Sequence, residues 1–327
     1  MLSQKLLAII QDGFPLVERP YKALAEMLNV SEQDVFDEVE KMRASGVIRR
    51  IGGVYDSKKL GFISRLCAGK VLASENDFSA EHHAQTPMEK FAAVVNVEPA
   101  ITHNYIRSHE YNVWFTVIAE NESAIQAVVD RVCSETDLHD VHVLTATKKY
   151  KINTVMGKGT NRHSEDRRAE ETSNFLRTLS EADKFRIHIA CDDIPHTLTP
   201  FKDWGVACDE LREDIDAKRM RRFGAILRHQ DAGFPCNAMV CFMLDEGTLA
   251  NSESAGSLLA KKHYVSHCYE RPSFENFPYN LYAMMHAQTP EELDGFIKES
   301  VSLLDNPEYV VLHSLKELKK TSFRFFA

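Results

Sequence analysis

Apolar side chains recur at helical spacing through the first 46 residues of the chain. "LLAIIQ" begins one predicted helix and "YKALAEMLN" gives a second, while residues 32–44 have the pattern of an amphipathic third helix. Ser31 precedes the third helix as an N-cap residue, and Gly46 follows it as a stop signal. The next stretch, "IRRIGGVYD", predicts a β-hairpin. Helix, short turn, helix and hairpin in this order indicate a winged helix-turn-helix domain.

Beyond residue 60 the pattern switches between strand and helix periodicity. The predicted elements are a strand at 63–73, a helix at about 78–93, strands at 100–108 and 111–120, a helix at 122–134 and a strand at 140–150. This βαββαβ order is that of a ferredoxin-like domain.

The second half of the chain repeats the first. "VIRRIGGVYDSKKLGF" (47–62) aligns without gaps with "RMRRFGAILRHQDAGF" (219–234), and "FPLVERPY" (14–21) aligns with "IPHTLTPF" (194–201). The same periodicity then predicts strands at 237–244, 264–270, 279–287 and 308–314 and helices at about 247–261 and 290–304. The second helix-turn-helix is shortened where the second helix of the motif is expected.

These patterns predict an α+β protein, built as a tandem repeat of a winged helix-turn-helix plus a ferredoxin-like βαββαβ domain. The predicted domains are a winged helix-turn-helix at 1–60, a ferredoxin-like domain at 61–156, a polar linker at 157–175, a degenerate winged helix-turn-helix at 176–234 and a second ferredoxin-like domain at 235–327.

Composition fits a globular protein with no membrane partner. Of 327 residues, 44% are hydrophobic, which is enough for sizeable cores, and no run approaches the ~18 apolar residues of a membrane span. The amino terminus lacks the features of a signal peptide. Seven scattered cysteines are an odd number without close pairs, as expected for thiols in a reducing compartment. We therefore expect a cytoplasmic protein.

The architecture resembles the Lrp/AsnC family, which joins a winged helix to a ferredoxin-like effector domain. That resemblance implies a transcription regulator that binds DNA and a small-molecule effector. The groove-reading helix, "EQDVFDEVEKMRA", disfavours DNA binding, because five acidic side chains oppose only Lys41 and Arg43 and the net charge of the chain is −9. In the alternative interpretation these acids are a solvated face, and Lys58, Lys59 and the wing arginines contact DNA.

A second motif recurs in both ferredoxin-like domains. "HNYIRSHEYNVWF" starts at His103 and "HCYERPSFENFPYNLY" starts at His267. Because side chains alternate along a strand, the residues at alternate positions share one face. In the first repeat these residues are His103, Tyr105, Arg107 and His109, and in the second repeat they are His267, Tyr269 and Arg271.

A face of this kind suits a ligand better than it suits a core. Packing faces use Val, Ile or Leu, whereas this one offers proton donors, phenols and guanidinium groups. If the two repeats pack these faces together, they form a cleft lined from both sides, with Trp114, Phe115 and Tyr282 nearby. Such a cleft suits a flat, apolar ligand edged with carboxylates, which arginine binds in bidentate fashion. The alternative is that histidines and arginines at an interface only satisfy one another.

The paired motifs, with "RRIGG" and "RRFGA" upstream, resemble the siroheme decarboxylases, which are Lrp-like proteins usually made of two related subunits. The chain looks like both subunits fused. The resemblance implies removal of two acetate carboxyls, at C12 and C18 of siroheme, to give 12,18-didecarboxysiroheme for haem d1 or alternative haem b biosynthesis. It also implies two halves packed as a pseudo-dimer, with a homo-oligomer as an option. No cofactor is expected, since the iron belongs to the substrate.

Site residues follow from the motifs and the resemblance together. The expected catalytic residues are His103, His267, Tyr105 and Tyr269. The expected substrate-binding residues are Arg107, Arg271, His109, Arg49, Arg50, Arg221, Arg222, Trp114, Tyr111 and Tyr279. No metal site of the protein's own is expected. Which histidine is the general acid, and whether one ligates the iron, is left open by the sequence.

Overall fold

The computed structural model describes residues 2–72, 86–136, 138–152, 179–227, 235–250, 254–321 and 323–326. The predicted linker at 157–175 lies outside these residues. The chain forms two units, and each takes segments from both repeats. The first unit is Met1–Phe62 with Val155–Gly233 and Arg324–Ala327, and the second is Ile63–Thr154 with Phe234–Phe323.

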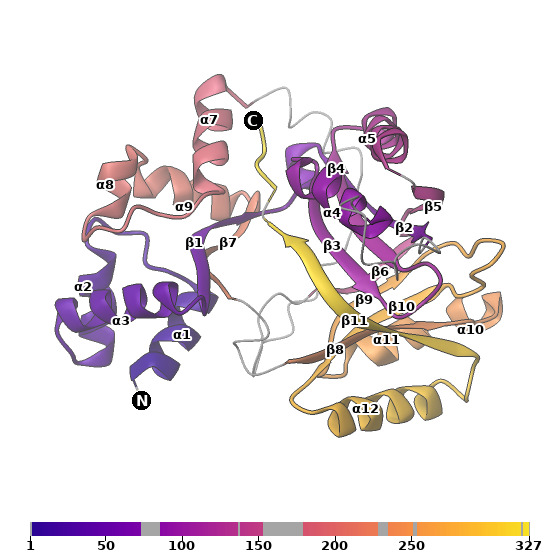
Figure 1. Cartoon of the computed structure of the whole chain (residues 1–327). Coiled ribbons are helices and arrows are strands. Elements are labelled where there is room, and N and C mark those ends of the chain that lie inside the picture. Colours follow the sequence, from indigo (N-terminus) through magenta and orange to yellow (C-terminus); the bar gives the residue numbers. More distant parts are fainter. Residues whose placement is uncertain are drawn as a thin grey trace, which may run out of the picture. The chain divides into compact units, whose positions relative to one another are not determined.

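The described residues of the first unit include two sets of three helices (Figure 1). The first repeat supplies α1 (Leu2–Asp12), α2 (Pro20–Leu28) and α3 (Glu32–Ala44), followed by β1 (Ile48–Tyr55) and the short η1 (Lys58–Leu60). The second repeat supplies α7 (Glu181–Ala190), α8 (Pro200–Trp204), α9 (Cys208–Asp216) and β7 (Met220–Leu227). Ser31 caps α3 as predicted, since its hydroxyl accepts the N–H of Asp34 at 3.1 Å. Both α8 and α9 are shorter than their counterparts, so the second motif is shortened throughout.

The predicted hairpin in "IRRIGGVYD" is wrong. The segment is one strand, β1, and it pairs antiparallel with β7 of the other repeat, with Gly52 opposite Gly224. Backbone proximity explains both glycines. A Cβ on Gly52 would lie 2.2 Å from the carbonyl oxygen of Asp192, and one on Gly224 would lie 2.5 Å from that of Ile10.

The second unit is built on one nine-stranded sheet, in the order β5-β2-β4-β3-β11-β8-β10-β9-β6. Its first-repeat strands are β2 (Ile63–Val71), β3 (Ile101–Arg107), β4 (Val113–Ala119), β5 (Leu138–Leu144) and β6 (Lys148–Ile152). Its second-repeat strands are β8 (Cys236–Phe242), β9 (Val265–Glu270), β10 (Leu281–Ala287) and β11 (Tyr309–Lys320). The helices are α4 (Pro87–Val97), α5 (Glu122–Glu135), α10 (Glu246–Ala250), α11 (Ala255–Ala260) and α12 (Pro290–Leu303).

Each repeat contributes a ferredoxin-like sheet, and the last strand of each repeat pairs with the other. The amino-terminal part of β11 pairs with β8, and its carboxyl-terminal part pairs with β3 of the first repeat. The last strand of the first repeat is divided into β5 and β6, because β5 pairs with β2 whereas β6 pairs with β9 of the second repeat. The single predicted strand at 140–150 is therefore two strands, and the one at 308–314 is longer than predicted. The predicted α+β class is confirmed.

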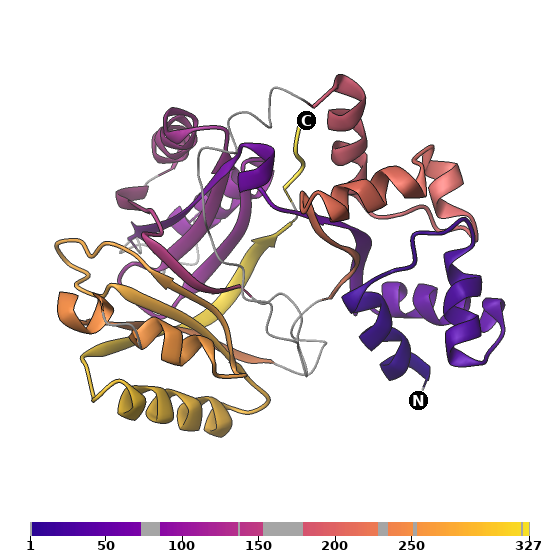
Figure 2. The same cartoon turned by 180° about the vertical axis from the view of Figure 1, so that it is seen from behind.

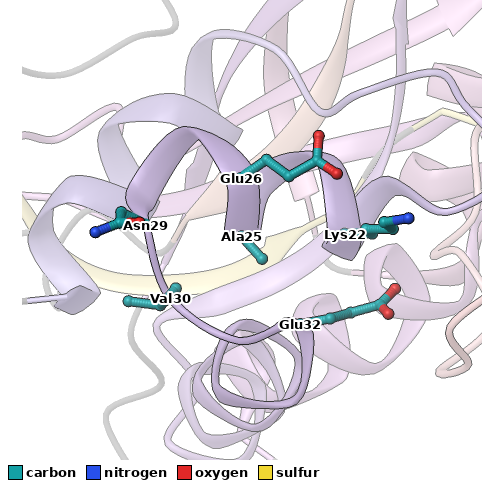
Figure 3. A pocket seen from close by; sticks show the side chains of 6 residues that line it. All are labelled: Lys22, Ala25, Glu26, Asn29, Val30 and Glu32. Atoms are coloured by element: carbon teal, nitrogen blue, oxygen red, sulfur yellow. The ribbon is translucent and has the colours of Figure 1, made fainter.

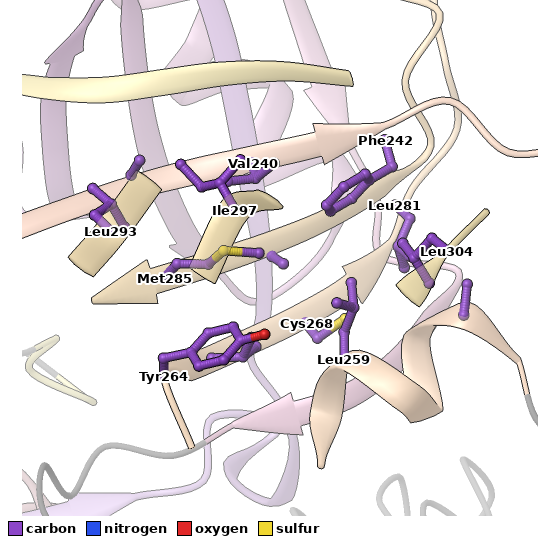
Figure 4. Close-up of a cluster of buried hydrophobic side chains, with 14 of the residues drawn as sticks. Val240, Phe242, Leu259, Tyr264, Cys268, Leu281, Met285, Leu293, Ile297 and Leu304 are labelled. Atoms are coloured by element: carbon purple, nitrogen blue, oxygen red, sulfur yellow. The ribbon is translucent and has the colours of Figure 1, made fainter. Parts of the chain in front are cut away.

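Three apolar clusters hold this unit together. One lies between α4, α5 and the first-repeat strands, and includes Phe91, Phe115 and Ile125. A second lies between α11, α12 and the second-repeat strands, and Figure 4 shows its packing around Met285 and Ile297. The third cluster joins residues of both repeats, among them Trp114 and Tyr282. Figure 2 shows the strands of both repeats from behind. Of the helices in the described residues, none is long and apolar enough to cross a membrane.

Candidate functional site

A β-bulge precedes the motif histidine in each repeat. In β3 the register with β4 jumps between Ile101 and His103, so Thr102 is an extra residue. In β9 the register with β10 jumps between Val265 and His267, so Ser266 is the extra residue. A bulge re-aims neighbouring side chains, which explains how adjacent residues contact each other. The hydroxyl of Thr102 lies 2.9 Å from Nδ1 of His103, and that of Ser266 lies 2.9 Å from Nδ1 of His267.

In the first repeat the register places the motif on the face opposite the helices. His103 pairs with Thr116 and Tyr105 pairs with Trp114, and Trp114 belongs to the apolar cluster shared by both repeats. Both motif residues are half-buried. The predicted alternation therefore holds for His103 and Tyr105, whereas the expectation that His109 shares this strand face is wrong, because β3 ends at Arg107.

The second repeat has the same arrangement. His267 pairs with Met284 and Tyr269 pairs with Tyr282, and both partners pack in the shared cluster. The rings of His267 and Tyr269 stack with centroids 6.3 Å apart. Each repeat thus presents its imidazole and phenol on the face away from its helices.

Arg107 reaches across to the second repeat. Its side chain is buried, and Nη1 donates to the carbonyl oxygen of Leu312 at 3.1 Å and to Oγ of Ser314 at 3.0 Å. The guanidinium lies 5.2 Å from the Tyr105 ring centroid, and burial lowers the pKa of Arg107. Its Nε is a buried donor without a hydrogen-bond partner in the described residues.

Arg271 makes the reciprocal contact with the first repeat. Its Nη1 donates to the carbonyl oxygen of Leu144, and its guanidinium lies 4.9 Å from the Tyr269 ring centroid. Burial lowers the pKa of Arg271, and its Nε also has no hydrogen-bond partner in the described part of the chain. The two arginines therefore join the repeats, and each has a buried Nε–H that no described residue accepts.

Aromatic side chains fill much of the shared cluster. The indole of Trp114 donates to the carbonyl oxygen of Tyr111 at 2.7 Å and packs against Phe277 at 5.7 Å. Tyr279 meets Phe277 edge-on at 4.8 Å. Phe115 was expected near the motif face together with Trp114 and Tyr282, but that expectation is wrong. Because successive side chains point to opposite faces of a strand, Phe115 packs under the helices against Phe91.

His109 lies beyond the end of β3. Its Nδ1 accepts the backbone N–H of Tyr111 at 3.1 Å, and its ring stacks on that of Tyr111. Burial lowers the pKa of His109, so its neutral form is favoured.

The Tyr111 hydroxyl is part of a cluster that the sequence did not reveal. It donates to Asp140 at 2.8 Å, and the same carboxylate lies 2.8 Å from Nε2 of His142. Burial and the Asp140 contact raise the pKa of Tyr111 to about 12. The sequence "LHDVH" contains both Asp140 and His142. What could not be predicted is the left-handed backbone at Asp140, with φ of 53°, which brings the carboxylate to Tyr111 and His142.

The four remaining predicted arginines lie in the first unit, on β1 and β7. Arg50 donates to the carbonyl oxygens of Asp192, just after α7, and Gly53. Arg222 donates to those of Gln11, at the end of α1, and Ala225. Each arginine thus caps the first helix of the other repeat, where the helix dipole favours a cation. Burial, with repulsion from Arg50, lowers the pKa of Arg222 to about 10.

The outward-facing arginines of this strand pair differ from the capping ones. Arg221 is exposed and forms an ion pair with Asp56 at 3.1 Å. Arg49 is half-buried; burial lowers the pKa of its neighbour Arg50, and the charge of Arg49 lowers it further. The structure places these four arginines on the paired strands β1 and β7 of the first unit, and it places both histidine motifs on the nine-stranded sheet of the second unit.

A surface hollow lies between α2 and the start of α3 (Figure 3). Its lining includes Lys22 and the two carboxylates Glu26 and Glu32, and Glu32 forms an ion pair with Arg19. Carboxylates at this junction disfavour a phosphate ligand. The hollow therefore gives no support to a nucleic-acid contact by the helix-turn-helix.

The motif strands combine side chains that are chemically able to bind an anion and to deliver a proton. Imidazole titrates near neutral pH, and guanidinium binds carboxylates in bidentate fashion. The apolar cluster beside them is closely packed, since Trp114, Phe277 and Tyr282 are at most 3% exposed. The bulge hydroxyls were not predicted, although the sequence carries a signal for them: a Thr or Ser stands directly before each motif histidine.

Comparisons with known proteins show which proteins this chain is similar to. Residues 73–151 and 231–319 match the AsnC-like ligand binding domain, and residues 3–49 match the siroheme decarboxylase NirDL-like HTH domain. The chain is 31% identical to a siroheme decarboxylase of Hydrogenobacter thermophilus over 334 residues, covering 99% of this chain and 94% of the relative. It is 42% identical to the siroheme decarboxylase alpha subunit of Desulfovibrio desulfuricans over 151 residues, covering 46% of this chain and 80% of that subunit.

Two crystal structures of the siroheme decarboxylase NirDL are similar over the whole chain. Each is 26% identical, covers 100% of this chain and 95% of the other, and superposes with a TM-score of 0.66. One of them is a co-complex with an iron-uroporphyrin III analogue.

Proposed function

Because the chain belongs to the siroheme decarboxylase family, we propose that it converts siroheme to 12,18-didecarboxysiroheme with release of two CO2. The observation that carries this proposal is the doubled motif. Both repeats present His, Tyr and Arg on the strand face opposite their helices, with a hydroxyl against each imidazole.

The reaction needs an electron sink and a proton. When the bond between an acetate CH2 and its carboxylate breaks, the electron pair stays on carbon and CO2 leaves. The conjugated macrocycle delocalises this pair, and one proton then gives a methyl group. The step is redox-neutral and requires no cofactor beyond the substrate itself.

We assign the proton donors to His103 and His267. Each Nδ1 faces a bulge hydroxyl, which fixes the ring, so Nε2 at the opposite edge delivers the proton. Tyr105 and Tyr269 lie on the same face and are the alternative donors.

Arg107 and Arg271 bind the carboxylates that remain. Each guanidinium is held by a backbone carbonyl of the other repeat, and each Nε lacks a protein acceptor among the described residues. A carboxylate at that edge satisfies the donor and fixes which acetate is at the reactive position. Through these contacts the two halves act as a pseudo-dimer.

We propose that the product serves haem d1 or alternative haem b biosynthesis. Seven free cysteines fit a reducing compartment, so we place the protein in the cytoplasm.

Anaerobic incubation with siroheme, followed by mass spectrometry, tests the proposal. The expected result is loss of the mass of two CO2 without added cofactor. Specific DNA binding with no turnover of siroheme would favour the regulator instead.

Variants of the two histidines separate their roles. His103→Ala and His267→Ala each remove a general acid, and that loss lowers turnover by ~10²–10⁴-fold. A mono-decarboxylated intermediate is expected to accumulate in one of them. Wild-type rates in both folded variants would move the assignment to Tyr105 and Tyr269.

A further inference from the structure

The motif histidine of the second repeat belongs to a hydrogen-bonded series of three side chains, and the described residues of the first repeat differ from it at one position. Oγ of Ser266 lies 2.9 Å from Nδ1 of His267 and 2.8 Å from Nε2 of His286. Ser266 and His286 are 5% and 7% exposed, so water does not readily replace either partner.

The corresponding position of the first repeat holds an apolar residue. The backbone N–H of His286 donates to Tyr264, and the N–H of Ile118 donates to Ala100 in the same place of the first repeat. Ile118 therefore corresponds to His286. Thr102 contacts His103 as Ser266 contacts His267, but the imidazole behind the hydroxyl is replaced by an isoleucine side chain.

Resting on the function proposed above, we infer that His286 is a positioning residue for His267. In the protonated state of His267, Nδ1–H donates to Oγ of Ser266, and the Ser266 hydroxyl donates to Nε2 of His286. All donors then point in one direction, an arrangement that strengthens each bond in a buried site. When Nε2 of His267 gives its proton to the substrate carbon, the neutral ring keeps its proton on Nδ1 and its orientation is unchanged.

Without His286, the hydroxyl of Ser266 turns to its remaining acceptor. That acceptor is the carbonyl oxygen of Met284, at the longer distance of 3.3 Å. The orientation of His267 is then less well fixed, whereas the groups proposed to bind the substrate are untouched. The two repeats are accordingly unequal, and the second carries the better-supported donor.

Four variants of the full chain test this inference. His286→Ile introduces the residue of the first repeat, and Ser266→Ala removes the hydroxyl. His286→Gln retains an acceptor at the same reach, and Ser266→Thr retains the hydroxyl. The exposed His263, which packs on Phe296, gives the control His263→Gln.

The single-turnover rate with siroheme and the siroheme Kd are measured for each variant. His286→Ile and Ser266→Ala are expected to slow one decarboxylation by ~10–100-fold, the worth of a charge-assisted hydrogen bond, with Kd unchanged. His286→Gln, Ser266→Thr and the control keep near-normal rates. Because Ser266 and His286 act through the same series of hydrogen bonds, the rate losses of the two single variants are not expected to multiply in the double variant. Normal rates in a folded His286→Ile variant, or losses that track Kd, would overturn the inference.

A readout without turnover separates this inference from the proposed function. In ¹⁵N-histidine spectra the neutral His267 ring is expected to carry its proton on Nδ1, and this preference weakens in Ser266→Ala and His286→Ile. A wild-type His267 protonated on Nε2 overturns the inference even if siroheme is decarboxylated. An inactive wild-type protein with the Nδ1 pattern refutes the function but not the positioning.

Discussion

At the scale of single residues, His109 predicts how stability depends on pH. Burial holds its pKa in the folded protein below the ordinary ~6.5 of the unfolded chain. As pH falls through ~6.5, the unfolded chain therefore binds a proton before the folded protein does, and the free energy of unfolding decreases. Protonation of Nδ1 also breaks the bond from the Tyr111 N–H. His109→Asn keeps an acceptor but does not titrate. Denaturant unfolding of this variant between pH 7.5 and about 5 is expected to change less than that of wild type. Equal pH dependence would contradict the assignment.

Arg107 predicts a loss of stability that is independent of substrate. Arg107→Ala leaves the carbonyl of Leu312 without this donor, which costs about 1–3 kcal/mol of unfolding free energy when such a group is buried. The control is Arg131→Ala, whose side chain is 52% exposed and pairs with Glu98 on the surface, and its effect is about 0–1 kcal/mol. Urea unfolding without siroheme measures both. An unchanged midpoint for Arg107→Ala would leave substrate binding as its sole role.

The sequence predicted which residues share the motif face, because strand alternation is a local rule. It did not predict that Thr102 and Ser266 sit in bulges, since a bulge is defined by the register with another strand. It also did not show that Arg50 and Arg222 cap helices of the opposite repeat, since these contacts join residues 142 and 211 positions apart.

At the scale of elements, the surroundings of two glycines predict opposite outcomes when each is replaced by alanine, since a methyl group on Gly52 of β1 would meet the end of α7, whereas one on Gly295 of α12 would meet no described atom within 4 Å. Gly52→Ala forces a methyl against the carbonyl of Asp192, and such overpacking costs about 1–3 kcal/mol. Gly295, inside α12, has open space around it, so Gly295→Ala is expected to stabilise by about 0.5–1 kcal/mol. Thermal unfolding measures both, and a neutral Gly52→Ala would mean that the helix end yields.

Most elements were predictable to within a few residues, because periodicity and capping are local. The helix expected at about 78–93 is α4 at Pro87–Val97, with residues 78–85 outside the described ones, and the helix expected at about 247–261 appears as α10 and α11. The errors in the strands fall where partners come from the other repeat. β1 was expected to fold back on itself, yet it pairs with β7, and the strand expected at 140–150 divides because its two parts pair with different strands.

At the scale of the whole molecule, reciprocal pairing predicts the behaviour of separated halves. A chain of residues 1–160 exposes the edges of β1, β3 and β6 that the second repeat covers. Exposed edges promote aggregation, so each half alone is expected to be poorly soluble and inactive. Co-expression of 1–160 with 170–327 is expected to restore a 1:1 complex and turnover, measured by co-purification and mass spectrometry. Full activity of one half alone would refute the shared site.

The tandem repeat itself was readable from the sequence, and so was the ferredoxin-like class of each copy. How the copies join was not readable, because β3 with β11 and β6 with β9 are pairings between segments that no local pattern relates.

The pairing of β3 with β11 occurs within a single polypeptide, so the association of the two copies does not depend on the protein concentration. Two separate subunits dissociate on dilution by mass action, whereas covalently joined copies meet at a fixed effective concentration. Joining them also frees each copy to change alone. In a symmetric homodimer every substitution appears twice, once in each protomer. Here one copy has a histidine, His286, at the position where the other copy has an isoleucine, Ile118, and both are inherited together as one gene product.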